Sequence, residues 1–212
     1  MSIGMILLVI TAILTLFGIS QRVLDSMHLS DRMALLLIAA IFVGGLIPDI
    51  SITDNFSFNI GGAVIPLGIC VYLFIKAGTA KERIRAIAAA LITGIVLYVL
   101  GRVLPDEPEA MVLDPNYLFG IVGGLIAYIL GRSRRSAFIA GILGVMLSQL
   151  INAIVMKLQG SPFSLNLGGG GFFDTIMLSG IIAVVFAEVV GEIIEKISEK
   201  SKREGWPDEN KA

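Results

Sequence analysis

Long apolar segments alternate along the chain with short polar or charged connections. Seven such runs, each ended by a charge cluster or by proline and glycine, cover Ile3–Ile19, Met33–Pro48, Phe58–Ile75, Ala86–Leu104, Tyr117–Gly131, Ser136–Met156 and Gly171–Ile194. A helix rises 1.5 Å per residue, so about 20 apolar residues cross the hydrocarbon core of a bilayer. The runs reach or approach this length. The pattern predicts an all-α membrane protein with about seven transmembrane helices.

The composition supports the same class of protein and excludes several kinds of disulfide and metal site. The chain is 56% hydrophobic and only 16% charged, whereas soluble domains carry about 25% charged residues. A single cysteine, Cys70, and a single histidine, His28, exclude an intramolecular disulfide, a thiolate cluster and a His-rich zinc site. We therefore expect no metal and no cofactor. A protein that is not an enzyme is favoured, and an enzyme stays open as an alternative.

Basic residues predict the orientation in the membrane. If the N-terminus lies outside, 14 of the 16 Lys and Arg residues fall in inner connections or in the tail, and only Arg102 and Lys157 remain outside. Cytoplasmic loops retain basic residues, so we expect a multi-pass plasma-membrane protein with N-out, C-in topology. The first segment lacks a basic leader and a clear cleavage site, which favours a retained helix over a cleaved signal peptide.

A short motif occurs twice. Phe56–Gly62 (FSFNIGG) is echoed 107 positions later by Phe163–Gly169 (FSLNLGG), with five of seven residues identical. Each copy lies in an outer connection before a predicted helix. We expect one polytopic domain over residues 1–195, made of parallel repeat halves at about 3–75 and 117–194 with a connector helix at about 84–104, followed by a charged cytoplasmic tail at 196–212. The alternative is a generic loop-to-helix entry used twice.

The motif combines an extended segment with a helix entry. Its apolar residues alternate with Ser and Asn, which is the period of a strand, so the two copies could pair as short extended or re-entrant segments. The glycines then allow close backbone approach and release the chain into a helix. Asn59 and Asn166 either cap the following helices or contact a ligand near a helix N-terminus. Gly61, Gly62, Gly168 and Gly169 belong to the same candidate site.

Three acids fall within or at the ends of predicted spans, where ionisable groups indicate function by default. Asp49 and Asp174 are expected near the outer boundary, and Glu188 lies fourteen positions beyond Asp174, about 21 Å deeper. The structural alternatives are an interfacial carboxylate for Asp49, a helix-dipole partner for Asp174, and an ion pair between Glu188 and Arg85 or another inner basic residue. Ser148 and Asn152 share one helix face and complete the candidate set.

Two family resemblances rest on these residues. Asp54–Pro66, together with Phe172-Phe173-Asp174 after the glycine run, resembles an uncharacterised prokaryotic integral-membrane family of unknown function, which implies no activity. Gly168–Asp174 is also similar to the Gly-x-Gly-Asp element of intramembrane aspartyl proteases, but two phenylalanines are interposed and Pro48-Asp49 stands where a Tyr-Asp pair belongs. That resemblance implies Asp49 and Asp174 as catalytic residues.

The preferred hypothesis is a transporter or channel for a small solute, an ion or a lipid, with an outward-facing polar site formed by the two motif copies and the membrane aspartates. The alternatives are an aspartyl protease-like hydrolase and a scaffold or assembly factor without a substrate. The expected partner is the lipid bilayer, and no feature favours nucleic acid. The small-residue spacing of Gly120 and Gly124 fits tight packing within the chain or a homodimer face.

Overall fold

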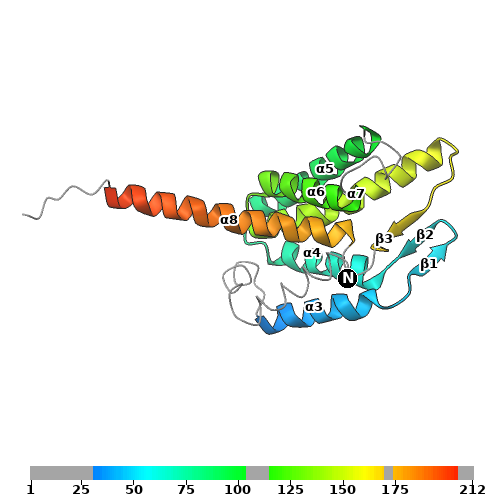
Figure 1. Cartoon of the computed structure of the whole chain (residues 1–212), viewed down its shortest axis with the longest axis horizontal. Coiled ribbons are helices and arrows are strands. Elements are labelled where there is room, and N and C mark those ends of the chain that lie inside the picture. Colours follow the sequence, from blue (N-terminus) through cyan, green and yellow to red (C-terminus); the bar gives the residue numbers. More distant parts are fainter. Residues whose placement is uncertain (1–30, 104–114, 170–173, 205–212) are drawn as a thin grey trace, which may run out of the picture.

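The computed structural model describes residues 31–103, 115–169 and 174–204 and is mostly helical (Figure 1). Six α-helices occur in these ranges: α3 (Asp31–Gly45), α4 (Ile65–Lys76), α5 (Ala80–Val103), α6 (Pro115–Gly131), α7 (Arg134–Leu158) and α8 (Thr175–Glu204). Each overlaps one of the predicted apolar runs, although α4 begins seven residues after the start of Phe58–Ile75 and α8 extends ten residues beyond Ile194. The predicted helical class is therefore confirmed for these six runs, and the run at Ile3–Ile19 lies outside the described residues.

The helices differ in how well they match the thickness of a membrane. By length and composition, α5 and α7 are able to cross one, each with a mean hydropathy of 2.1. The other apolar helical stretches in the described ranges hold 10–17 residues. Charges at the start of α3 and in the second half of α8 shorten their apolar parts. Two candidate spans are therefore supported, and neither seven spans nor the N-out, C-in orientation is confirmed.

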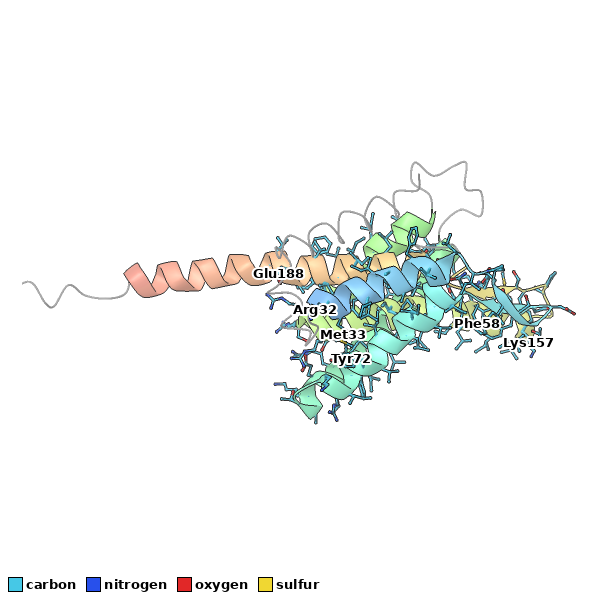
Figure 2. The ribbon with its side chains drawn as sticks, turned by 90° about the horizontal axis from the view of Figure 1, so that it is seen from below. Arg32, Met33, Phe58, Tyr72, Lys157 and Glu188 are labelled. Carbon is cyan, nitrogen blue, oxygen red and sulfur yellow. The ribbon has the colours of Figure 1, made fainter. Side chains whose placement is uncertain are left out.

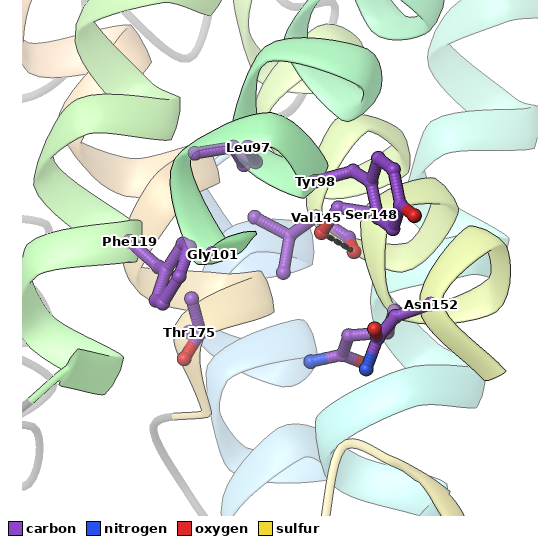
Figure 3. Close-up of a pocket in the computed structure, with 9 residues that line it drawn as sticks. Leu97, Tyr98, Gly101, Phe119, Val145, Ser148, Asn152 and Thr175 are labelled. Atoms are coloured by element: carbon purple, nitrogen blue, oxygen red, sulfur yellow. Dashed lines mark hydrogen bonds between the residues drawn. The ribbon is translucent and has the colours of Figure 1, made fainter. Parts of the chain in front are cut away.

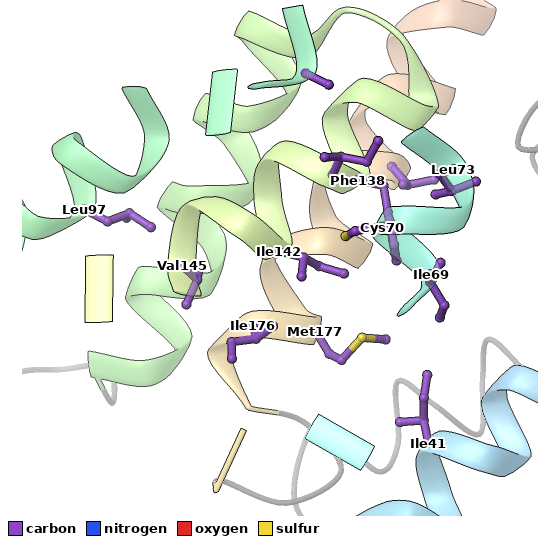
Figure 4. Packing of buried hydrophobic residues seen from close by; sticks show 13 residues of the cluster. Ile41, Ile69, Cys70, Leu73, Leu97, Phe138, Ile142, Val145, Ile176 and Met177 are labelled. Carbon is purple, nitrogen blue, oxygen red and sulfur yellow. The ribbon is translucent and has the colours of Figure 1, made fainter. Parts of the chain in front are cut away.

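Helices α5 to α8 form a bundle in which α7 packs against both α5 and α8 (Figure 1). Small residues allow the close approach: Gly144 lies against Thr93 of α5, and Gly141 lies against the backbone of Ser179 in α8. Figure 4 shows the core side chains that fill the bundle and the joint with α4, including Leu97, Ile142, Val145, Ile176 and Cys70. Gly120 and Gly124 pack on Leu178 and Ile182 of α8, so both are used for packing within one chain.

The outer surface of the bundle is apolar. On α5 alone, Ile84, Ile95 and Val103 are 68%, 53% and 76% exposed, and similar side chains are exposed on α3, α4, α6, α7 and α8. Soluble monomers rarely expose contiguous apolar surface on this scale. This distribution favours a membrane environment for the helices.

A small sheet lies at one end of the helices, to the right in Figure 1. It consists of β1 (Ile50–Thr53), β2 (Phe56–Phe58) and β3 (Leu165–Leu167), in that order. β1 and β2 are antiparallel, and β2 pairs with β3 in parallel, with Ser57 opposite Asn166. The predicted pairing of the two motif copies is thus confirmed, although the copies are displaced by two residues in the ladder. After β2 the chain passes through a short π-helical turn, η1 (Ile60–Val64), into α4.

Candidate functional site

Asp49 connects the two motif copies. Its Oδ1 accepts a hydrogen bond of 2.9 Å from Nδ2 of Asn59, and its Oδ2 accepts one of 2.8 Å from Nδ2 of Asn166. Asp49 follows α3, Asn59 precedes η1 and Asn166 lies in β3. We call these three residues together with Asp174 the Asp49 network. The network ties α3, the start of α4 and the start of α8 to the sheet.

The two-residue displacement of the strands makes this arrangement possible. Side chains alternate between the two faces of a sheet with a period of two. Asn166 is opposite Ser57 in the ladder, and Asn59 lies two residues beyond Ser57 in extended conformation, donating its backbone N–H to the oxygen of Leu167 at 2.9 Å. An even displacement keeps Asn59 and Asn166 on the same face, where one carboxylate reaches both. An odd displacement would place them on opposite faces.

Asn59 is a helix cap. Its Oδ1 accepts from the backbone N–H groups of Gly61 and Gly62 at 2.9 and 3.0 Å, and its Nδ2 also donates to the oxygen of Ile47 at 3.1 Å. The side chain is buried and its hydrogen-bonding groups are occupied. The capping hypothesis is therefore confirmed for Asn59. It is wrong for Asn166, because this residue lies within β3, nine positions before α8 begins.

The motif glycines are used for close backbone contacts. A Cβ atom on Gly62 would overlap the carbonyl oxygen of Gly168, and one on Gly61 would overlap the backbone of α3 at Ile41 and Gly45. Gly168 also has a φ of +75°, a left-handed conformation that glycine adopts without steric cost. Gly169 lies against the side chain of Asn166. The second glycine of one copy thus packs on the first glycine of the other.

Asp174 is buried immediately before α8. Its carboxylate accepts hydrogen bonds from the backbone N–H groups of Gly168 and Thr175 and from the Thr175 hydroxyl. Burial raises the pKa of the Asp174 carboxyl, and the negative charge of Asp49 raises it further, while the hydrogen bonds act in the opposite direction. The two acids predicted at the outer boundary therefore lie close enough to repel each other.

A pocket of about 300 Å³ lies next to this network, between α5, α6, α7 and the first turn of α8 (Figure 3). We call it the outer pocket, because it lies at the end of the bundle that the sequence predicts to be extracellular. Its polar lining consists of Tyr98, Ser148, Gln149, Asn152 and Thr175, and its apolar lining of Leu97, Gly101, Phe119 and Val145. Thr175 belongs to the pocket and also donates to Asp174. Ser148 and Asn152 were predicted to lie with the aspartates; they line this adjacent pocket instead, and Thr175 connects the two.

The outer pocket contains polar groups with free hydrogen-bonding capacity. Oε1 of Gln149 is buried and accepts no hydrogen bond within the described part of the chain. The Ser148 hydroxyl donates to the oxygen of Val145 at 2.7 Å, and the contact from Nδ2 of Asn152 to the Met156 sulfur is long, at 3.9 Å. No pattern in the sequence singled out Tyr98 or Thr175, because Tyr98 lies between apolar residues and Thr175 is a single hydroxyl after Asp174. Their role depends on the packing of the bundle.

Glu188 lies at the other end of the bundle and takes no part in the outer arrangement. It forms an ion pair with Arg134 at the start of α7. The hypothesis of a structural ion pair between Glu188 and a basic residue is confirmed, with Arg134 rather than Arg85 as the partner. Figure 2 shows Glu188 and Arg32 toward one end of the molecule and Phe58 and Lys157 toward the other.

Comparisons with known proteins give a family but no activity. A protein-family model described as a protein of unknown function (DUF1614) matches residues 38–186, which include the Asp49 network and the outer pocket. No curated protein matches the chain, and no solved structure matches it. The resemblance to an uncharacterised family is therefore confirmed, and the resemblance to intramembrane aspartyl proteases finds no support.

Proposed function

The chain belongs to the DUF1614 family, whose function is unknown, and we propose that it is a multi-pass plasma-membrane transporter or channel for a small uncharged polar solute. The observation that carries the proposal is the outer pocket, a polar cavity of about 300 Å³ inside a bundle with an apolar surface. Binding sites for small molecules are concave and largely apolar, with a few placed polar groups. This pocket is concave and more polar than most, and its hydroxyl and amide groups lie beside apolar side chains that could contact a solute.

The lining of the pocket favours an uncharged solute. The polar side chains that line it carry hydroxyl and amide groups, and none of the described lining residues is ionisable near neutral pH. An ion in such surroundings would lose its hydration without gaining a counter-charge. A solute with hydroxyl or amide groups would instead exchange hydrogen bonds with the Gln149 and Asn152 amides that line the pocket. Phe119 and the Tyr98 ring supply apolar contact area.

A route through the bundle is suggested by a line of small and hydroxyl-bearing residues that winds slowly around α8. It consists of Thr175, Ser179, Ala183, Ala187 and Gly191, each four positions after the last. Thr175 lines the outer pocket, whereas Ala187 and Gly191 line a second pocket at the opposite end. The distance from the first to the last is about 24 Å along the helix. The two pockets would be the ends of one pathway.

Two buried hydroxyls lie between these ends. Thr93 of α5 and Ser179 of α8 are fully buried, and their hydroxyl oxygens have no hydrogen-bond partner within the described residues. Buried polar groups without partners are unusual in folded proteins. A Cβ atom on Gly123 would lie 2.8 Å from the Ser179 hydroxyl and 3.0 Å from Leu97, so apolar packing closes the pathway here. Passage of a solute would require Leu97 to move and would supply partners for the hydroxyls.

The proposed orientation places the outer pocket on the extracellular side. Arg132, Arg134 and Arg135 lie at the end of the bundle opposite the Asp49 network, and basic residues favour the cytoplasmic side. In this proposal the Asp49 network serves as the scaffold of the outer mouth, because Asn59 and Asp49 use their polar groups on each other and on the backbone. Thr175 connects the scaffold to the solute site.

The test is solute permeability of liposomes that contain the purified full-length protein. Vesicles are shrunk osmotically with glycerol, erythritol or urea, and the rate of re-swelling is followed by light scattering. We expect faster re-swelling than in protein-free vesicles for at least one solute. Gln149→Leu and Asn152→Leu should each slow it by about tenfold, equivalent to about 1.4 kcal/mol. Ile154→Ala, at an exposed position on the same helix, is the matched control. Equal rates with and without protein, or unchanged rates in both pocket variants, would overturn the proposal.

A further inference from the structure

The pocket at the opposite end of the bundle has a different chemistry from the outer pocket. We call it the arginine pocket; its volume is also about 300 Å³. Its lining comes from the connection between α6 and α7 and from the first turn of α7, from the first turn of α5 and from α8, and comprises Arg132, Ser133, Arg134, Arg135, Glu82, Ala187 and Gly191. Three arginines therefore line one cavity. The small residues Ala187 and Gly191 leave its α8 side open.

The carboxylates near this pocket are already occupied. Glu82 accepts a hydrogen bond of 2.9 Å from the Ser133 hydroxyl and one of 3.3 Å from the backbone N–H of Gly78, and it lies 3.7 Å from Nε of Arg135. Arg134 pairs with Glu188. Among the side chains that the structure describes, two acids thus pair with two of the three arginines, which leaves one positive charge in excess at the cavity.

Arg132 supplies that excess charge. Its side chain makes no hydrogen bond or ion pair within the described part of the chain, whereas Arg135 donates to the oxygen of Lys76 at 2.8 Å. Arg132 also has a φ of +59° and is the one non-glycine residue with positive φ in the described ranges. This conformation after a helix end is the one in which glycine is favoured, and side chains other than glycine, asparagine and aspartate adopt it at a steric cost. Backbone strain of this kind is concentrated at functional positions.

We infer that the arginine pocket binds a phosphate-type oxyanion, supplied by the headgroup of an anionic membrane lipid or as free phosphate. Guanidinium groups bind phosphate oxygens through paired N–H donors, and the first turn of α7, which starts at Arg134, adds the positive end of a helix dipole. Ile129 and Val189 are exposed nearby on α6 and α8, where acyl chains would lie. The inference depends neither on transport nor on the orientation in the membrane.

The experiment measures binding to the full-length protein in detergent. Phosphatidylglycerol and phosphatidylcholine are titrated separately, and inorganic phosphate is titrated against chloride at equal ionic strength. Occupancy is read by native mass spectrometry for the lipids and by the shift in melting temperature for all three. We expect phosphatidylglycerol to bind more tightly than phosphatidylcholine. Arg132→Gln should weaken that binding by about tenfold, and it breaks no ion pair.

Two further variants separate a specific site from general surface charge. Lys81→Gln removes one positive charge from an exposed position at the same end of the bundle, outside the pocket lining, and should leave binding unchanged. The joint change Arg134→Gln and Glu188→Gln removes a second arginine without leaving an unpaired acid, and should weaken binding further. A response to inorganic phosphate that depends on Arg132 indicates a free anion as the ligand, and a response to phosphatidylglycerol alone indicates a lipid. Equal losses in Arg132→Gln and Lys81→Gln, or no preference for an anionic ligand, would overturn the inference.

Discussion

Asp49 and Asn166 are 117 positions apart in the chain and are joined by a hydrogen bond of 2.8 Å. The same carboxylate accepts from Asn59, so one side chain receives an amide N–H from each copy of the repeated motif. The duplicated sequence is therefore used to build one junction, from which α4 and the segment leading to α8 depart. The stability of this junction can be tested directly.

Removal of the Asp49 carboxylate should destabilise the fold. In Asp49→Ala the Asn59 amide is left buried without one of its acceptors, and leaving a buried donor unsatisfied costs about 1–3 kcal/mol. We expect a lower melting temperature in detergent. Asp54→Ala removes the same charge from the exposed turn between β1 and β2 and should change the melting temperature far less. Similar decreases in the melting temperature of both variants would show that the loss of negative charge, and not the loss of the hydrogen bonds, destabilises the fold.

The close contact between the motif glycines predicts that Gly62→Ala is disruptive. The new methyl group would overlap the backbone of Gly168, and backbone cannot move aside as a flexible side chain does. We expect a loss of several kcal/mol, within the upper range for overpacking, seen as a large drop in melting temperature or in the yield of monodisperse protein.

The matched control is Gly68→Ala in α4. A Cβ atom there would meet nothing within 4 Å, and alanine is favoured over glycine in a helix by about 1 kcal/mol. This variant should melt at the same temperature as the parent or higher. A tolerated Gly62→Ala would contradict the close packing of the two motif copies.

Asp174 should make stability depend on pH. Because its pKa is raised by burial and by Asp49, the folded state binds more protons than the unfolded state between the ordinary pKa of about 3.9 and the raised value. Stability contributed by this group therefore falls as the pH rises through that window. Melting temperatures of the parent and of Asp174→Asn are compared from pH 4 to pH 8. The melting temperature of the variant should rise relative to that of the parent as the pH rises. A difference that stays constant, or that shifts in favour of the parent, would contradict the raised pKa of Asp174.

The proposed pathway predicts solvent access to Ser179. The chain has one cysteine, Cys70, which is buried in the apolar core, so the parent serves as an internal control. In a Cys70→Ala background, Ser179→Cys should react with a small water-soluble thiol reagent in proteoliposomes, and a solute that is transported should change the rate. Cys70 in the parent should stay unmodified. If Ser179→Cys is as unreactive as Cys70 while permeability persists, the solute takes another route.

The lengths of the apolar runs and the positions of the charged residues predict most of the helices of this protein and some of its polar contacts. Six predicted helices, the strand period in the FSxNxGG copies and the pairing of Glu188 with a basic residue followed from local patterns, because burial of apolar side chains and the cost of isolated charge act on each segment separately. The same reasoning predicted that Asp49 and Asp174 lie near the same boundary of the membrane. It placed the start of α4 too early, because the motif copy before this helix forms β2 and the π-helical turn η1, and it ended α8 ten residues too soon.

Tertiary structure alone decided which polar groups meet. The ladder displaces the motif copies by two residues, and this register brings Asn59 and Asn166 to one carboxylate. Packing of α5 to α8 separates Ser148 and Asn152 from the aspartates and places them in a pocket with Tyr98 and Thr175. It also places three arginines, from the connection after α6 and from the first turn of α7, around a second cavity. A linear pattern specifies the face and depth of each residue, whereas register and helix packing depend on contacts between segments that are distant in the sequence.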